Sequence, residues 1–256
     1  MVDRYVGVVT GAGGDIGAAV CRALGARGCG VLCVDLTEEL AARGAEEVRK
    51  AGGVAEVFAA DVTDERQVFA YADRARELWG VAHFFFNNAG IEGAESPIIS
   101  YRLEDWERVF AVNVRGVFLG LKAMVHLLEH ELVTRIVNTA SVAGIIATPQ
   151  LAAYGASKHA VIGLTKTAAV EFAPLNIAVN ALCPGPVESQ MMRRIERGLG
   201  GDEGAAQAHR EFEARIPHAR YASLEEVAEL ATYLLLDCPV YLTGQAITLD
   251  GGLSVV

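Results

Sequence analysis

The chain has 256 residues, of which 52% are hydrophobic and 21% are charged, and its formal net charge is −10. This size and composition predict one globular domain, 1–256, with a large core. The negative charge disfavours nucleic acid and anionic membranes as partners, because phosphate groups are bound through clustered Lys and Arg. The sequence contains no signal-peptide profile and no apolar run of membrane-spanning length, so we expect a cytoplasmic protein.

Short apolar runs rich in Val, Ile and Phe alternate with longer amphipathic stretches, which is typical of a parallel sheet connected by helices. We therefore predict an α/β fold, a doubly wound parallel sheet of about seven strands, Rossmann-like, in a single domain. The predicted strands are 5–10, 31–35, 54–60, 81–87, 135–140, 177–183 and 246–249. The predicted helices are 16–27, 38–51, 64–79, 103–131, 154–173 and 223–236, the last beginning with a capping box of Ser223 and Glu226.

The segment 186–220 breaks this alternation. Several glycines interrupt charge-rich helical runs there: Gly198, Gly200, Gly201 and Gly204. Because the segment lies between the last two strands, we predict an irregular, mobile lid over a substrate.

Cysteines are spread through apolar segments, with no Cys-x-x-Cys pair and no nearby His to complete a metal site. We expect reduced core thiols without a redox role, and no metal. They are Cys21, Cys29, Cys33, Cys183 and Cys238.

A glycine-rich turn, 10–17 (Thr-Gly-Ala-Gly-Gly-Asp-Ile-Gly), follows the first strand and leads into a helix. Glycine permits a tight turn and lets a pyrophosphate approach the helix N–H groups, whose partial positive charge favours the anion. Asp35 ends the second strand, 18 residues beyond Gly17. Its carboxylate can accept hydrogen bonds from ribose hydroxyls and would repel a 2′-phosphate, so NAD is favoured over NADP.

Tyr154 and Lys158 stand four positions apart in a predicted helix. Residues i and i+4 share one helix face, so the phenol and the ammonium would project into one cleft. A cation near a phenol favours the phenolate, which would let Tyr154 exchange a proton with a substrate oxygen near neutral pH. The pair, with Ser141 upstream at a strand end, indicates hydride chemistry on an alcohol or ketone.

In the order and spacing of these motifs the chain resembles the short-chain dehydrogenase/reductase family over essentially its whole length. The family turn Thr-Gly-x-x-x-Gly-x-Gly is matched at Thr10, Gly11 and Gly17, but Asp15 replaces its middle glycine. The Asp15 side chain either crowds the pyrophosphate or points outward and accepts a hydrogen bond from a helix N–H as a cap. We expect the outward cap, with Asp15→Gly leaving NAD binding within a few-fold.

Further segments resemble family motifs one by one. Asp61-Val62 resembles the pair along adenine, 87–90 (Asn-Asn-Ala-Gly) resembles the motif that steadies the sheet and lines the cofactor channel, and 184–189 resembles the Pro-Gly-x-Val-x-Thr segment beside the nicotinamide. The resemblance implies these cofactor-binding residues: Gly11, Gly14, Asp15, Ile16, Gly17, Asp35, Leu36, Asp61, Val62, Asn88, Ala89, Gly90, Tyr154, Lys158, Pro184, Gly185, Val187 and Ser189.

The resemblance also implies a catalytic tetrad of Asn113, Ser141, Tyr154 and Lys158. Ser141 would hold the substrate oxygen, and Tyr154 would be the general acid or base. Lys158 would lower the pKa of the phenol and bind the nicotinamide ribose, and Asn113 would hold a water that links Lys158 to solvent.

The stretch after Ser141 is mostly apolar, which favours an uncharged secondary alcohol or ketone, cyclic ones included. Arginines in the predicted lid, at 193, 194 and 197, leave an anionic substrate open. The candidate substrate-binding residues are Ser141, Ala143, Ile145, Gln150, Tyr154 and Met191.

Two other functions are compatible with parts of the sequence. His126, Glu129 and His130 form the His-x-x-Glu-His pattern of a class of zinc hydrolases, and a dinucleotide-binding sensor without turnover would keep the nucleotide motifs.

The helices 103–131 and 154–173 carry more apolar residues than one core face needs. Family members pair such helices and the C-terminal segment 249–256, so we expect a homo-oligomer, with a tetramer favoured over a dimer.

Overall fold

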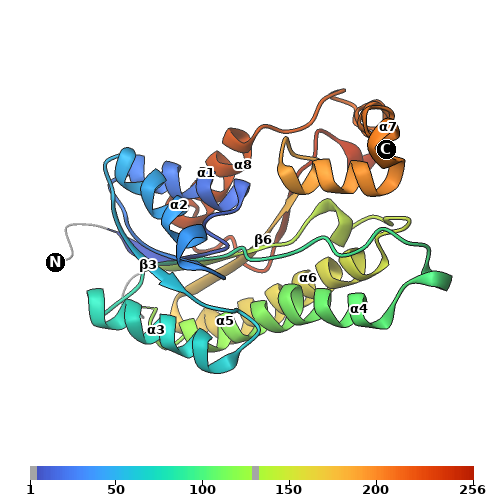
Figure 1. Ribbon diagram of the computed structural model, residues 1–256. Coiled ribbons are helices and arrows are strands. Elements are labelled where there is room, and N and C mark those ends of the chain that lie inside the picture. Colours follow the sequence, from blue (N-terminus) through green and yellow to red (C-terminus); the bar gives the residue numbers. More distant parts are fainter. Residues whose placement is uncertain (1–4, 129–132) are drawn as a thin grey trace.

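Seven parallel strands form one sheet in the order β3-β2-β1-β4-β5-β6-β7 (Figure 1). The structure is a computed structural model that describes residues 5–128 and 133–256. The predicted doubly wound α/β fold is confirmed. The strands are β1 (Val6–Thr10), β2 (Gly30–Asp35), β3 (Val54–Ala59), β4 (Phe84–Asn87), β5 (Thr134–Thr139), β6 (Ile177–Pro184) and β7 (Ala246–Leu249).

Helices cover both faces of the sheet (Figure 1). One layer contains α1 (Asp15–Ala26), α2 (Glu38–Lys50) and α8 (Leu224–Thr232), and the other contains α3 (Glu65–Trp79), α4 (Leu103–Phe110), α5 (Gly116–Met124) and α6 (Ala152–Phe172). Successive strand residues face opposite layers, so Val8 belongs to the core under α3, α5 and α6 while Val9 belongs to the core under α1 and α8. This two-sided burial explains the nearly continuous apolar runs in the strands.

The strand order reverses at β1, which pairs with β2 on one side and with β4 on the other. The loops that leave β1 and β4 therefore diverge, and a crevice opens between them at the carboxyl edge of the sheet. Thr10 fixes the two loops relative to each other, because its Oγ1 accepts the N–H groups of Asn88 at 3.0 Å and Ala89 at 3.2 Å. The strand order alone therefore predicts that the functional site lies in this crevice.

The predicted helix 103–131 is helical from Leu103 to Met124 but is not a regular α-helix throughout. A π-helical turn, Ala111–Arg115, separates α4 from α5, and α5 ends at Met124. Asn113 lies inside this turn and is fully buried, and its side chain bonds the backbone of Ile91. A π turn inserts an extra residue into the helix, which commonly marks a functional position. The last part of the predicted range lies outside the described residues.

The segment 186–220 is mostly helical, although an irregular segment was predicted. Its helix α7 (Gln190–Arg215) consists of two helical pieces that meet at Gly201, and the other three glycines named from the sequence do not interrupt it. Ser189 caps it by accepting the N–H of Met192 at 3.2 Å. The helix is kinked at Gly201, where φ is 68° and ψ is 176°. Each glycine weakens a helix by only about 1 kcal/mol, and the good helix formers that follow outweigh that cost.

Among the described residues no helix is long and apolar enough to cross a membrane. All five cysteines are buried and form no disulfide. Within the same residues no group of three or more His, Cys, Asp or Glu side chains is arranged to hold a metal ion. Of the His-x-x-Glu-His pattern, Glu129 and His130 lie outside the described residues, while His126 is exposed in the turn that follows α5.

Candidate active site

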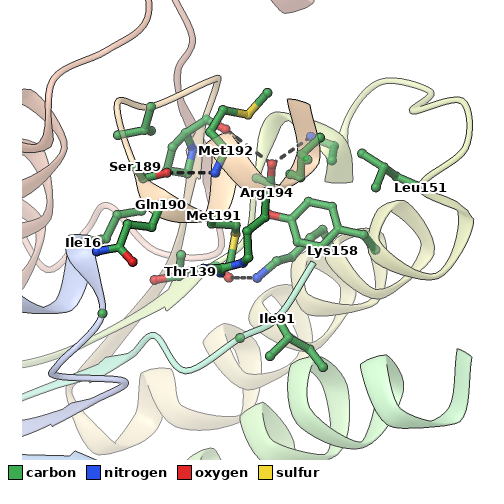
Figure 2. A pocket seen from close by; sticks show the side chains of 18 of the residues that line it. Ile16, Ile91, Thr139, Leu151, Lys158, Ser189, Gln190, Met191, Met192 and Arg194 are labelled. Carbon is green, nitrogen blue, oxygen red and sulfur yellow. Dashed lines mark hydrogen bonds between the residues drawn. The ribbon is translucent and has the colours of Figure 1, made fainter. Parts of the chain in front are cut away.

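A cavity of about 1190 Å³ runs along the carboxyl ends of the strands, from the glycine-rich turn to α6 and α7. Figure 2 shows the end of the cavity that lies beside α6 and α7. Thr139 at the end of β5, Ile91 and Lys158 line one side of it. Met191, Met192 and Arg194 from α7 line the other. Every cofactor-binding residue named from the sequence lines this one cavity.

The glycine-rich turn is held tightly against its neighbours. A Cβ on Gly17 would lie 2.0 Å from the carbonyl oxygen of Gly11, and one on Gly13 would lie 2.1 Å from that of Leu40, so neither position tolerates a side chain. Gly14 is different, because a Cβ there would meet only the Gly11 oxygen, at 3.4 Å. Gly14 caps α1 without a side chain, so the first N–H groups of the helix are free to bind an anion.

Asp35 is fixed beside this turn. Its Oδ2 accepts the N–H of Gly13 at 2.9 Å, and its Oδ1 accepts the N–H of Leu36 at 2.8 Å. A carboxylate has about four acceptor positions, so each oxygen can still accept a ribose hydroxyl. The donor and acceptor groups at this end of the cavity therefore fit an adenosine diphosphate.

The Asp15 carboxylate accepts a helix N–H, as a cap would, but the helix is not its own, and Asp15 lines the cavity. Its Oδ2 accepts the N–H of Gln190, the first residue of α7, at 2.5 Å. Sequence reasoning missed this partner because the two residues lie 175 positions apart.

Tyr154 and Lys158 both face the cavity from α6, one turn apart, as the spacing predicted. The Lys158 Nζ lies 5.5 Å from the centroid of the Tyr154 ring. It donates to the Thr139 carbonyl oxygen at 2.7 Å, and Lys158 is only 4% exposed. The lysine is therefore held beside the phenol by the end of β5.

Burial sets the proton affinities of this pair. It raises the pKa of Tyr154 to about 12, although the hydrogen-bonding contact with Ser141 lowers that pKa. It lowers the pKa of Lys158 from its ordinary 10.5 to about 8. From the sequence we expected the Lys158 ammonium to stabilise the Tyr154 phenolate. In the folded protein, the effect of burial on the pKa of Tyr154 outweighs the attraction between these two charges, so the phenol is neutral at pH 7.

Ser141 directs its hydroxyl toward the same end of the cavity. Its Oγ accepts the N–H of Ala143 at 3.1 Å and lies 3.4 Å from the Pro184 carbonyl oxygen. Because Ser141 also lowers the pKa of Tyr154, the two hydroxyl groups converge, and one substrate oxygen can contact both.

Asn113 does not line the cavity. Its Nδ2 donates to the carbonyl oxygen of Ile91 at 2.8 Å and to Ser157 Oγ at 3.0 Å, and its Oδ1 accepts the N–H of Ile91 at 2.8 Å. Asn113 thus connects the loop after β4 to α6 through Ser157, the residue that precedes Lys158. The side chain is occupied by protein partners, so its water-holding role stays a prediction.

The substrate candidates divide into two groups. Ala143, Gln150 and Met191 line the cavity with Ser141 and Tyr154, whereas Ile145 does not and is 40% exposed. Ile145 directly follows a 3₁₀ turn, Val142–Gly144. Its neighbour, Ile146, lines the cavity in its place.

Sequence reasoning also missed an ion pair at the substrate end. Arg194 lines the cavity, and its Nε donates to Glu92 Oε1 while a terminal nitrogen lies 3.4 Å from Oε2. Glu92 is only 9% exposed. The other two arginines named from the sequence, at 193 and 197, do not line the cavity.

A family model described as enoyl-(acyl carrier protein) reductase matches residues 11–254. The chain belongs to the short-chain dehydrogenase/reductase family. Levodione reductase of Leifsonia aquatica is 36% identical over 254 residues, which cover 98% of this chain and 94% of the relative. The 2-(S)-hydroxypropyl-CoM dehydrogenase 3 of Xanthobacter autotrophicus is 37% identical over 249 residues, covering 97% of this chain and 96% of that protein.

Solved structures of this family superpose closely. A crystal structure of levodione reductase has a TM-score of 0.93 at 34% identity, covering 98% of this chain and 97% of that one. An NAD⁺-bound xylitol dehydrogenase also has a TM-score of 0.93, at 35% identity, covering 97% of this chain and 98% of that one. These relatives are dehydrogenases and reductases, so this member of the family is an oxidoreductase.

Proposed function

We propose that this protein is an NAD-dependent oxidoreductase that interconverts a secondary alcohol, cyclic ones included, and its ketone. One observation carries the proposal: Tyr154, Ser141 and Lys158 meet at one end of a cavity whose other end is the glycine-rich turn with Asp35. The named relatives support it, because they include a levodione reductase and an NAD⁺-bound xylitol dehydrogenase.

NAD would lie along the cavity, with its pyrophosphate at the free N–H groups of α1 and its adenosine ribose at Asp35. When bound, it supplies the hydride acceptor for alcohol oxidation or the hydride donor for ketone reduction. The Asp35 carboxylate would repel a 2′-phosphate, so NADP should be a poor substitute.

The chain's own residues would handle the substrate oxygen and its proton. Ser141 donates a hydrogen bond to that oxygen and orients it. Tyr154 protonates the oxygen during ketone reduction and accepts its proton during alcohol oxidation. Lys158, positively charged below its pKa of about 8, stabilises the phenolate that forms transiently when Tyr154 gives up its proton.

The substrate should carry no charged group close to its hydroxyl or carbonyl carbon. Met191, Ile146 and Ala143 provide apolar surface, and the guanidinium of Arg194 is already neutralised by Glu92. A carboxylate substrate would have to compete with Glu92 for that guanidinium. We therefore favour neutral alcohols and ketones over hydroxy acids.

The ion pair gives a direct test of this specificity. Glu92→Gln keeps the shape and an acceptor oxygen for Arg194 but removes the neutralising charge. We expect the ratio of kcat/KM for 3-hydroxybutyrate to that for 2-butanol to rise about tenfold or more, because a freed guanidinium can pair with a carboxylate. The measurement is NADH formation at 340 nm with both alcohols.

Glu171→Gln is the matched control, because it removes the same charge from an exposed position on α6. It should leave the ratio unchanged. An equal effect of the two substitutions, or no effect of Glu92→Gln, would rule out Glu92 as the group that selects against anions.

The reaction itself is tested by an absorbance screen at 340 nm with NAD⁺ and, in parallel, with NADP⁺. Secondary alcohols, cyclic diols, polyols and hydroxysteroids form the panel. We expect turnover with NAD⁺ and much weaker turnover with NADP⁺. Binding of NAD⁺ without turnover of any compound would favour a dinucleotide sensor instead.

We also propose that the protein is a homo-oligomer, with a tetramer favoured. Large apolar side chains are exposed on the helices and the C-terminal segment that were expected to pair, namely Phe118 on α5, Val170 on α6, and Val255 and Val256. A second copy of the chain would bury them.

A further inference from the structure

The hydrogen bond from Gln190 to Asp15 joins two segments that line the cavity from different sides. Asp15 is the first residue of α1 and belongs to the glycine-rich turn, whereas Gln190 is the first residue of α7. Both residues line the cavity, at its nucleotide end (Figure 2 shows the turn at Ile16 beside Gln190). A glycine at position 15, as in the family turn, has no side chain and cannot make this bond.

The carboxylate of Asp15 is well placed electrostatically. It lies at the N-termini of α1 and α7 together, and each terminus carries partial positive charge that favours an anion. Arg194 lies close enough for Asp15 to contribute to its raised pKa, after the larger effect of Glu92. Because these groups compensate the negative charge, the carboxylate should repel a neighbouring pyrophosphate only weakly.

A second contact holds the same turn of α7 from another direction. Arg194, one helical turn after Gln190, pairs with Glu92 in the loop after β4. The first turn of α7 is thereby attached to the glycine-rich turn by Asp15 and to the β4 loop by Glu92. Met191 and Met192, which lie between the two attachments, line the cavity.

We propose that Asp15 is a positioning residue that fastens the first turn of α7 to the phosphate-binding turn, so that cofactor binding and the placement of α7 over the substrate end are coupled. The coupling rests on the proposed function, because it requires NAD at the glycine-rich turn. Asp15 itself acts on α7 and makes little direct contribution to cofactor affinity.

Hydrogen–deuterium exchange of the amides in 190–195 tests this in the full-length protein, with Asp15→Ala, Asp15→Gly and Asp15→Asn, each without and with NAD⁺. We expect exchange about fivefold faster in the Ala and Gly variants, the factor that a lost capping bond gives. Asp15→Asn should restore slow exchange, because its amide oxygen accepts the same N–H. NAD⁺ should slow exchange in α7 of the unchanged protein more than in the Ala variant.

Calorimetric titration with NAD⁺ provides the second readout. Because coupling between two sites is reciprocal, the dissociation constant should rise in the Ala and Gly variants by no more than the factor by which NAD⁺ slows exchange in α7 of the unchanged protein. Asp15→Asn should keep the affinity of the unchanged protein. Ser223→Ala is the matched control: it removes the capping acceptor of α8, which bonds the N–H of Glu226 at 3.2 Å and lies outside the cavity lining. It should leave exchange in α7 unchanged.

Unaltered exchange in Asp15→Ala and Asp15→Gly would overturn the proposal. A loss of NAD⁺ affinity that exceeds this coupling factor by tenfold or more would also overturn it, since Asp15 would then act on the cofactor directly. If NAD⁺ fails to bind the unchanged protein, the proposed function and the coupling both fall. The exchange comparison without NAD⁺ then still decides whether Asp15 holds α7.

Discussion

Tyr154→Phe is expected to lower kcat by about 10³-fold or more, because it removes the one hydroxyl that can exchange a proton with the substrate oxygen. The phenyl ring keeps the packing of α6 against the cavity. NAD⁺ binding should therefore stay within a few-fold of the unchanged protein. Turnover is measured at 340 nm with the best alcohol from the screen, and NAD⁺ binding by calorimetry.

Residual activity within tenfold of the unchanged protein would remove Tyr154 from the chemistry. Ser141→Ala is the useful comparison, because it removes a hydrogen bond to the substrate oxygen and leaves the proton donor in place. We expect a smaller loss from Ser141→Ala than from Tyr154→Phe, and the reverse order would exchange the roles assigned to the two hydroxyl groups.

Lys158→Met is expected to lower kcat by about 10²-fold and, at the same time, to make the protein more stable at pH 7. Burial lowers the pKa of Lys158 to about 8 from 10.5, so below pH 8 the folded protein holds a charge that the interior disfavours. The destabilisation is full below pH 8 and disappears as pH rises toward 10.5, where the unfolded chain also loses the proton. Removing the ammonium should raise the free energy of unfolding at pH 7 by about 3 kcal/mol, and the lost bond to Thr139 should lower it by about 1 kcal/mol.

Urea unfolding at pH 7 and pH 10 checks the sign, since the stability difference between the variant and the unchanged protein should shrink at pH 10. Lys166→Met is the matched control, because Lys166 is exposed on the same helix. It should change neither kcat nor the pH dependence. A loss of stability in Lys158→Met at pH 7 would mean that the hydrogen bond to Thr139 outweighs the cost of burying the charge.

The sequence was sufficient to predict the features that depend on local pattern. Apolar runs such as Val6–Thr10 and Phe84–Asn87 identify buried strands, and the i and i+4 spacing places Tyr154 and Lys158 on one helix face. Parallel strands then bring their carboxyl ends to one edge, which predicts where the site lies, and the resemblance to the family supplied the individual cofactor residues.

The features that were missed depend on contacts between distant segments. The bond of Gln190 to Asp15 and the pairing of Arg194 with Glu92 connect α7 to loops far away in the chain, and no local pattern marks them. The glycines of α7 were read as helix breakers, but only Gly201 adopts a conformation that requires glycine. Burial also decided the pKa of Tyr154, and burial is a property of the folded protein.

The strand order has a consequence for how function arises during folding. The cavity is lined by residues that follow β1, β2, β3, β4, β5 and β6, and neighbouring strands such as β1 and β4 are joined only through long crossover connections. No hairpin or single βα unit therefore contains the complete site, and such non-local pairings form late and slowly. Catalytic activity consequently appears only once the central sheet is complete, which makes turnover a sensitive reporter of correct assembly.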